Sequence, residues 1–196
     1  MGDPRIVWNA NNLDFPGRLT GWEKHLRTDR EFGRSGGGVA VVQMHHHFFE
    51  IVVEINNFDN RTFYNDLIAF WVWAGRGEQF AFALDSAKVA NLTLNGAAAA
   101  GQKDIPLADT SSVVVGDTYL LREAAGDKME VIEVASITTN VKAVAVSNLK
   151  YGYLTGDVFR ATDYFPKLKT PDADLPAEEI ITTFAFGPLK MVEDRG

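Results

Sequence analysis

Apolar residues recur at helical spacing over residues 62–74. Phe63, Leu67, Phe70, Trp71 and Ala74 fall at i, i+4, i+7, i+8 and i+11, which are positions on one face of an α-helix. The spacing predicts a helix that buries a wide aromatic face. Such a helix needs a sheet to pack on, and the rest of the chain should supply one.

The two ends of this predicted helix carry boundary signals. Thr62 can cap the start, and Asp66 lies near the start, where the helix dipole favours a carboxylate. Gly75 can close the last turn. We therefore expect the helix to begin at Thr62 and to end before Gly75.

The period changes to two directly after the helix. Phe80, Phe82 and Leu84 alternate with Gln79, Ala81 and Ala83, which predicts a strand with one apolar face. We expect the helix and this strand to form the core through six residues: Phe63, Leu67, Phe70, Trp71, Phe80 and Phe82.

The N-terminal third has further strand signals. Residues 6–8 form a short strand candidate before a turn-rich break at 9–12, and Trp8 and Trp22 are expected to be core or interface anchors. Residues 39–55 are β-branched and aromatic, which predicts one long strand or two strands joined near the histidines. From Phe48 onward the odd positions are expected to be buried, and the even positions, Glu50 among them, to face water.

A charged segment at residues 24–38 ends in Ser35-Gly-Gly-Gly38. This composition predicts a mobile loop or arm. In assembly proteins such arms often become ordered only against a neighbouring copy, whereas in most single-domain proteins they are ordinary loops. Deletion of residues 27–38 is then expected to leave the monomer folded and to block assembly.

A run of short strands occupies the middle of the chain, at residues 104–107, 118–123, 130–137, 143–147 and 158–160, with a hairpin turn at 124–128. Val115-Gly-Asp-Thr-Tyr119 is echoed by Thr155-Gly-Asp-Val-Phe159, and in each copy the Asp is expected to bond nearby backbone. Short strands with frequent turns predict a small barrel or compact sandwich.

The expected architecture is therefore mainly β with one prominent helix (α+β). Residues 1–95 and 161–196 form a β-sandwich or belt-like domain that ends in a strand at 180–186, and residues 96–160 form a small barrel-like insertion.

Bulk composition narrows the possible functions. With 46% hydrophobic residues among 196, the chain can bury a core, but no apolar run reaches the roughly 18–20 residues of a membrane span. The N-terminal residues lack the pattern of a secretion signal. A net charge of −7 disfavours direct binding of nucleic acid, and the lack of cysteine excludes disulfides and thiolate sites.

The charge is unevenly distributed along the chain. Basic residues gather at 24–34 and acidic residues at 172–194, which is compatible with contacts between copies or with an ordinary solvated surface. The candidate assembly interface comprises ten residues: Arg27, Arg30, Arg34, Gly36, Gly37, His45, His47, Asp172, Asp174 and Glu178.

Candidate chemistry is sparse. In a regular strand only His45 and His47 of the triple histidine share a face, and a third metal ligand would have to come from elsewhere, so packed or interface histidines are the favoured interpretation. The carboxylate pairs Glu50/Glu54 and Glu130/Glu133 do not have the arrangement of an acid–base pair. We expect no catalytic residue, no metal and no cofactor.

Two segments resemble a known family. Leu67-Ile-Ala-Phe-Trp-Val-Trp-Ala-Gly-Arg-Gly-Glu-Gln-Phe-Ala-Phe82 is similar to a segment of tail-tip and distal-tail proteins of tailed bacteriophages, in which a Phe-Trp helix precedes a Gly turn and an aromatic strand. The segments at 98–109, 115–123 and 130–137 resemble a small β module of phage virion proteins. Together the two regions cover a little over half of the chain.

The resemblance implies a non-enzymatic structural subunit of the virion tail, synthesised in the host cytoplasm. Distal-tail proteins form a ring, usually of six copies, that joins the tail tube to tip, hub or fibre proteins. The chain is shorter than the larger members, which carry a full C-terminal carbohydrate-module-like domain. The implied partners are further copies of this chain and other tail proteins, without nucleic acid or membrane insertion.

Three alternatives remain open. One is a tail-completion or head–tail joining protein. Another is a carbohydrate-binding module that uses exposed Tyr119, Tyr151 and Tyr153 as a stacking platform. The third is a small hydrolase that uses Glu50 or His45.

Overall fold

The structure is a computed structural model of the 196-residue chain. It describes residues 2–16, 19, 21–34, 40–126, 128–170, 177–180 and 183–194. For residues 28–34, 40–48, 55–58, 177–180 and 183–188 the description covers the backbone alone.

The chain divides into two compact units. One contains Ala83–Tyr164 together with the N-terminal Gly2, and the other contains Asp3–Phe82 and Phe165–Gly196. The backbone N–H of Leu84 donates to the carbonyl oxygen of Asp163 at 3.0 Å, so the first unit begins and ends at neighbouring points. Its boundaries lie at Ala83 and Tyr164, whereas the sequence-based division placed the insertion at 96–160.

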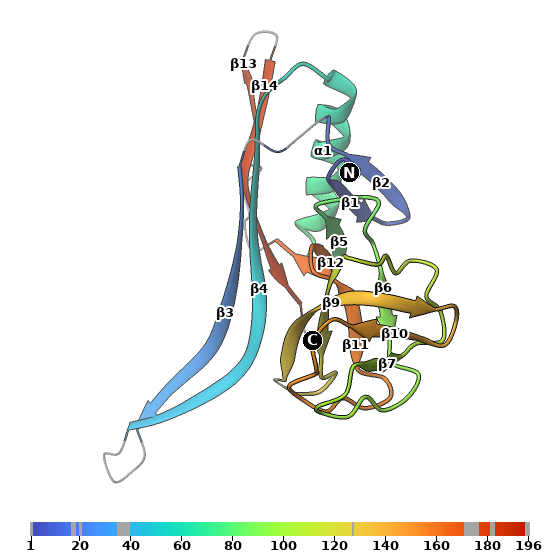
Figure 1. The fold of residues 1–196 in the computed structure, drawn as a ribbon. Helices are drawn as coiled ribbons and strands as arrows, with labels where there is room; N and C mark the ends of the chain where they lie inside the picture. The colour runs from blue at the N-terminus through green and yellow to red at the C-terminus, as the bar shows by residue number, and fades with distance from the viewer. Residues whose placement is uncertain are drawn as a thin grey trace. The chain divides into compact units, whose positions relative to one another are not determined.

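The discontinuous unit is built on an eight-stranded sheet (Figure 1). Its strand order is β2-β1-β5-β12-β14-β4-β3, and β13 pairs with β14 off this path. The strands are β1 (Arg5–Trp8), β2 (Asn11–Asp14), β3 (Gly21–Arg34), β4 (Ala40–Phe58), β5 (Phe80–Ala83), β12 (Tyr164–Lys169), β13 (Ala177–Ile180) and β14 (Thr183–Glu193).

Helix α1 (Arg61–Ala74) packs its aromatic face on this sheet. The ring of Phe70 lies 4.9 Å from that of Phe80, edge to face, and 6.0 Å from that of Trp8. The ring of Phe63 lies 5.4 Å from that of Phe15. All six residues expected in the core are buried: Phe63, Leu67, Phe70, Trp71, Phe80 and Phe82.

The start of the helix differs from the prediction. Asn60, not Thr62, is the N-cap, because its side-chain oxygen accepts the backbone N–H of Phe63 at 3.0 Å. No acidic residue lies in the first turn, so the expected dipole role of Asp66 was wrong. Gly75 ends the helix as expected, and its N–H donates to the carbonyl of Trp71.

Strand β5 is buried on both faces. Ala81 and Ala83 are buried as well as Phe80 and Phe82, so the prediction of a strand with a single apolar face was wrong. β5 lies between β1 and β12 in the strand order and is therefore a central strand of the sheet.

The predicted mobile arm is largely a strand. β3 runs from Gly21 to Arg34 and pairs antiparallel with the 19-residue β4, from Gly21↔Glu54 to Arg34↔Ala40. The alternative of two strands joined near the histidines is also excluded, since β4 is continuous. Charge and glycine content suggested a loop, but cross-strand pairing decides the local structure.

The continuous unit is a six-stranded, curled sheet with the order β6-β11-β8-β9-β10-β7. A bridge between Leu94 and Leu107 links the ends of its two edge strands, which makes the unit barrel-like. The strands are β6 (Asn91–Thr93), β7 (Asp104–Pro106), β8 (Thr118–Arg122), β9 (Met129–Thr138), β10 (Lys142–Ala145) and β11 (Val158–Ala161). The predicted hairpin between β8 and β9 is present, and β6 was not predicted.

The sequence echo corresponds to a structural repeat. The N–H of Gly116 donates to the carbonyl oxygen of Val134 at 2.8 Å, and the N–H of Val134 donates to the carbonyl oxygen of Asp117 at 3.0 Å. In the second copy, the N–H of Gly156 donates to the carbonyl oxygen of Leu94, and the N–H of Leu94 donates to the carbonyl oxygen of Asp157, both at 2.9 Å. Gly116 and Gly156 have positive φ angles of 85° and 92°, a conformation that favours glycine.

The aspartates of the two copies differ in their side-chain partners. Asp157 accepts backbone N–H groups of Leu154 and Ala124, as expected for a turn aspartate. Asp117 instead accepts a hydrogen bond from the ammonium group of Lys88 at 2.6 Å.

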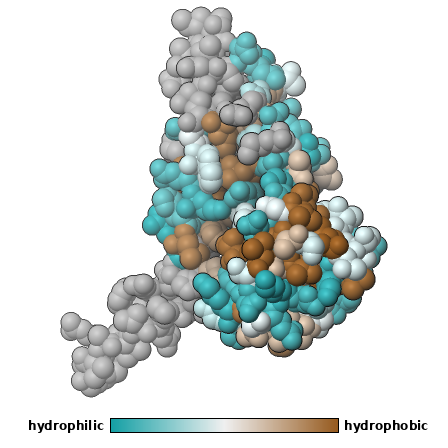
Figure 2. Space-filling model, in the orientation of Figure 1, coloured by the Kyte–Doolittle hydropathy of each residue, from teal (hydrophilic) through white to brown (hydrophobic). Residues whose placement is uncertain are grey.

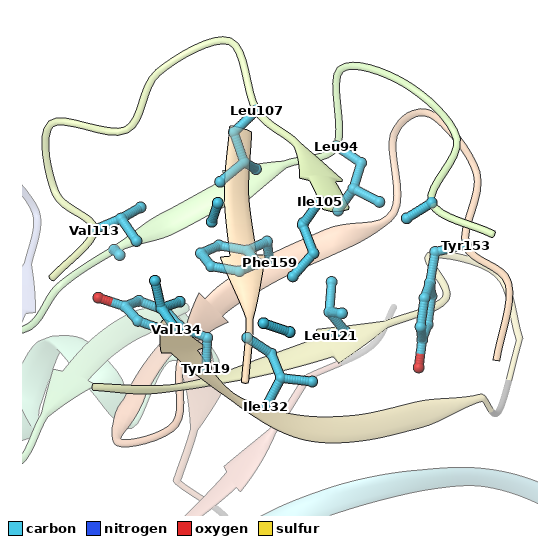
Figure 3. Close-up of a cluster of buried hydrophobic side chains, with 14 of the residues drawn as sticks. Leu94, Ile105, Leu107, Val113, Tyr119, Leu121, Ile132, Val134, Tyr153 and Phe159 are labelled. Atoms are coloured by element: carbon cyan, nitrogen blue, oxygen red, sulfur yellow. The ribbon is translucent and has the colours of Figure 1, made fainter. Parts of the chain in front are cut away.

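The barrel-like unit has a hydrophobic core of its own (Figure 3). The rings of Tyr119 and Phe159, which are equivalent residues of the two echoes, stack 4.7 Å apart at 14°. The core residues span Ala90 to Ala161, all within this unit. The fold class is therefore mainly β with one helix, as predicted, with a barrel-like part.

Candidate assembly surface

The last strand of the eight-stranded sheet presents an apolar margin. β3 ends the strand order, so within the described part of the chain only one of its edges is paired. Trp22 and Leu26 lie opposite Val53 and Phe49, and cross-strand partners share a face of the sheet. Val53 is fully buried, whereas Trp22 and Leu26 are 47% and 52% exposed. The apolar face of the sheet therefore continues beyond its buried part into the exposed side chains of Trp22 and Leu26.

The ladder of β3 and β4 also extends beyond the rest of the sheet. β14 pairs with β4 from Glu50 to Phe58, and the register of β3 with β4 continues from Thr28↔His47 to Arg34↔Ala40. We call residues 28–34 and 40–47 the ribbon. Seven residues of strand span about 23 Å. Two-stranded ribbons are marginally stable in water, so this one gains by packing against another surface.

On the opposite face of the sheet, Glu50 joins three strands. Its carboxylate oxygens lie 2.7 Å from a guanidinium nitrogen of Arg27 on β3 and 2.9 Å from the ammonium nitrogen of Lys190 on β14. The hydrogen bond from Arg27, followed by that from Lys190, holds the pKa of Glu50 below its usual value, against the opposing effect of burial. Glu50 is 8% exposed, so the expectation that it faces water was wrong.

The structure places only part of the predicted interface together. Arg27, Arg30 and Arg34 all lie on β3, and His45 and His47 lie on the adjacent β4. Glu178 lies on β13, which pairs with β14 rather than with β3 or β4. The remaining four predicted residues, Gly36, Gly37, Asp172 and Asp174, lie outside the described residues.

The tyrosines of the barrel-like unit do not form a sugar-stacking platform. Tyr119 and Tyr153 are 2% and 1% exposed and belong to the core, and only Tyr151 is open to solvent. Apolar surface is present elsewhere on this unit, as Figure 2 shows for one face. Val131 on β9 and Val146 beyond β10 are 61% and 45% exposed.

The other candidate chemistry has structural explanations. The Glu130 carboxylate accepts backbone N–H groups of Lys150 and Tyr151 and so fixes a loop. Glu133 is exposed on β9. Among the side chains that the structure describes, no group of three or more His, Cys, Asp or Glu residues is arranged to hold a metal ion.

Comparison with known proteins gives no assignment: neither any protein-family model nor any curated protein significantly matches the sequence. In the described part of the chain, no helix has the length and apolar character needed to span a bilayer.

Two features of the surface were missed from the sequence. The Glu50–Lys190 ion pair joins residues 140 positions apart, and no local pattern predicts such a pair. The exposed position of Leu26 at the margin was also not predicted. Trp22 was expected to be a core or interface anchor, and its exposure rules out the core alternative.

Proposed function

We propose that this protein is a non-enzymatic structural subunit of a tailed-bacteriophage virion. In this proposal it forms a ring of copies in the tail tip or baseplate and joins the tail tube to tip or fibre proteins. The resemblance of residues 67–82 and of the β module to distal-tail proteins supports the virion assignment. The six-fold symmetry rests on that resemblance alone.

The observation that carries the proposal is the incomplete edge of the sheet at β3. An edge strand with unpaired backbone groups and an adjoining apolar margin is a template for another chain. Trp22 and Leu26 supply that margin. The ribbon extends beyond the end of β14, and among the described residues no third strand pairs with it. A neighbouring copy that packs here would cover both features.

Ring formation requires two different surfaces on each copy, because its contacts are heterologous. The sheet has two different ends, β3 and β2, with different sequences and lengths. Lys24 and Arg27 on β3 restrict unwanted edge pairing, since a charged edge accepts only a complementary surface. This arrangement favours a specific contact over open aggregation.

The register gives a precise test. Arg27 pairs with Phe48, so replacing residues 28–47 by an Asn-Gly turn would close the hairpin at that pair and remove only the ribbon. Arg27 and its bond to Glu50 remain in this variant. We expect sedimentation velocity to show a closed oligomer for the full chain and a monomer for the ribbonless variant.

The matched control is the thermal unfolding curve of both proteins. The ribbonless variant should unfold cooperatively, because β4 from Glu50 onward keeps β14 as its neighbour. A folded ribbonless variant that assembles like the full chain would overturn the ribbon's role. A full chain that stays monomeric at every concentration would overturn the ring.

A further inference from the structure

The two copies of the Gly-Asp echo differ in what accepts one equivalent backbone N–H group. In the second copy the N–H of Leu154 donates to the carboxylate of Asp157 at 2.7 Å. In the first copy the equivalent N–H, that of Val114, donates instead to the hydroxyl of Tyr119 at 2.8 Å. The second copy has Phe159 at this position, which carries no hydroxyl. Tyr119 therefore closes the turn in the first copy, a role that an aspartate has in the second.

This exchange gives Asp117 a different role from its equivalent, Asp157. The carboxylate of Asp117 accepts a hydrogen bond from the ammonium group of Lys88 at 2.6 Å, and both residues line a small cavity. Asp157 is buried, and its carboxylate accepts two backbone N–H groups. The first copy thus presents at a cavity the carboxylate that the second copy uses to hold its own backbone.

The cavity lies within the barrel-like unit and has a volume of about 40 Å³. One water-sized group needs about 10–15 Å³, so the cavity has room for about three such groups. A sugar ring is larger than this, whereas the end of an unbranched side chain fits. The charged and hydroxyl residues of the lining are Lys88, Asp117, Thr118, Thr162 and Asp163.

Hydrogen-bond acceptors outnumber donors among these residues. The carboxylates of Asp117 and Asp163 only accept, and each threonine hydroxyl has two lone pairs for its single proton. The hydroxyls of Thr118 and Thr162 lie 3.1 Å apart, so one of them donates to the other. Lys88 is the single cationic residue of the lining, and its ammonium group donates to Asp117. Such a lining favours a ligand group that is cationic and that donates several hydrogen bonds.

We propose that this cavity binds the ammonium group of a lysine side chain from a partner protein. An ammonium group is compact and carries three donors, and the methylene stem behind it lies readily on apolar surface. Exposed apolar residues adjoin the lining along the chain: Val89 follows Lys88, and Val115 lies two positions before Asp117. The net charge of −7 also favours a cationic partner. The site goes beyond the proposed virion function and does not depend on it.

The test is saturation-transfer-difference NMR of the full chain with Nα-acetyl-lysine N-methylamide as the probe. Nα-acetyl-norleucine N-methylamide is the matched control, because it has the same carbon chain and lacks the ammonium group. We expect saturable binding of the lysine probe, with the largest signal on the methylene next to the ammonium group, because that end lies in the cavity. The norleucine probe should give no saturable signal.

Three variants locate the site. Asp117→Asn keeps the shape of the side chain, removes its charge and should weaken binding of the lysine probe about fivefold or more. Tyr119→Phe makes the first copy resemble the second, so Asp117 is expected to turn to the N–H of Val114, with a similar loss of affinity. Asp104→Asn is the control, because Asp104 pairs with Lys142 at 2.7 Å and neither residue lines the cavity. It should leave the affinity within about twofold of wild type.

Thermal unfolding of each variant establishes that it is folded before its affinity is compared. Absence of saturable binding to the wild type overturns the site, and so does equal binding of the norleucine probe. Unchanged affinity in folded Asp117→Asn, or an equal loss in Asp104→Asn, also overturns it, since either result means that general surface charge attracts the probe.

Discussion

Glu50 shows how one buried carboxylate fixes an edge strand. It lies between Arg27 of β3 and Lys190 of β14, so that a single side chain links three strands on the face away from the apolar margin. Both cations are about half exposed, at 51% and 43% of their side chains. The interaction is therefore stronger than a surface ion pair but remains partly screened by water.

Replacing Glu50 by Gln tests this link. The variant should lose about 1–2 kcal/mol of unfolding free energy at pH 7, because two charge-assisted hydrogen bonds are weakened. Urea denaturation measures the loss. Glu78→Gln, at an exposed position of the same unit, is the control and should change stability by less than about 0.5 kcal/mol.

The pH dependence of the same variant has a defined sign. The folded state lowers the pKa of Glu50 from its ordinary value of 4.5. The carboxylate's contribution is therefore complete above pH 4.5 and is lost as the pH falls through the lowered folded-state pKa. The gap between wild type and Glu50→Gln should shrink with acidification, and a gap of constant size would show that the charge is not responsible.

At the scale of elements, helix α1 illustrates both the reach and the limit of sequence patterns. The central part of the helix is predicted by the spacing of Phe63, Leu67, Phe70 and Trp71, because helical geometry brings residues at this spacing onto one face that can be buried together. Its start does not follow in the same way. Asn60 and Thr62 are both good cap residues, and the choice depends on how the chain leaves β4.

The cap assignment can be tested with paired alanine variants. Asn60→Ala should cost about 1 kcal/mol, because the N–H of Phe63 loses its acceptor. Thr62→Ala should leave stability unchanged or slightly raised, since alanine has the higher helix propensity. Thermal unfolding distinguishes the two, and a larger loss in Thr62→Ala would reverse the assignment.

Strand β3 shows why part of the candidate surface could not be predicted. Its charged residues and the following glycines are typical of a loop, and the strand forms because β4 pairs with it along its whole length. The register shift between Thr28 and Arg30 is likewise a property of the pair and not of either strand. The Gly-Asp echo, in contrast, was readable because glycine with positive φ leaves a local sequence signal.

At the scale of the whole molecule, the barrel-like unit has the features of an independently folding insertion. Its core lies within residues 90–161, and its ends are joined by the Leu84–Asp163 hydrogen bond. We expect an excised fragment of residues 83–164 to unfold cooperatively on heating, as followed by circular dichroism.

Phe159 provides the control for that fragment. It is fully buried and stacks on Tyr119, so Phe159→Ala should cost about 3–5 kcal/mol and lower the midpoint in the fragment and in the full chain alike. A fragment that lacks a cooperative transition would show that the unit depends on the rest of the chain.

The measurement that tests the central proposal most directly is molar mass by light scattering across a concentration series, with and without about 0.5 M salt. The account predicts a closed oligomer of fixed mass that dissociates more readily in high salt, because charges on β3 contribute to the contact and salt screens them. A mass of 21.6 kDa, that of one chain, at every concentration in both conditions would contradict it.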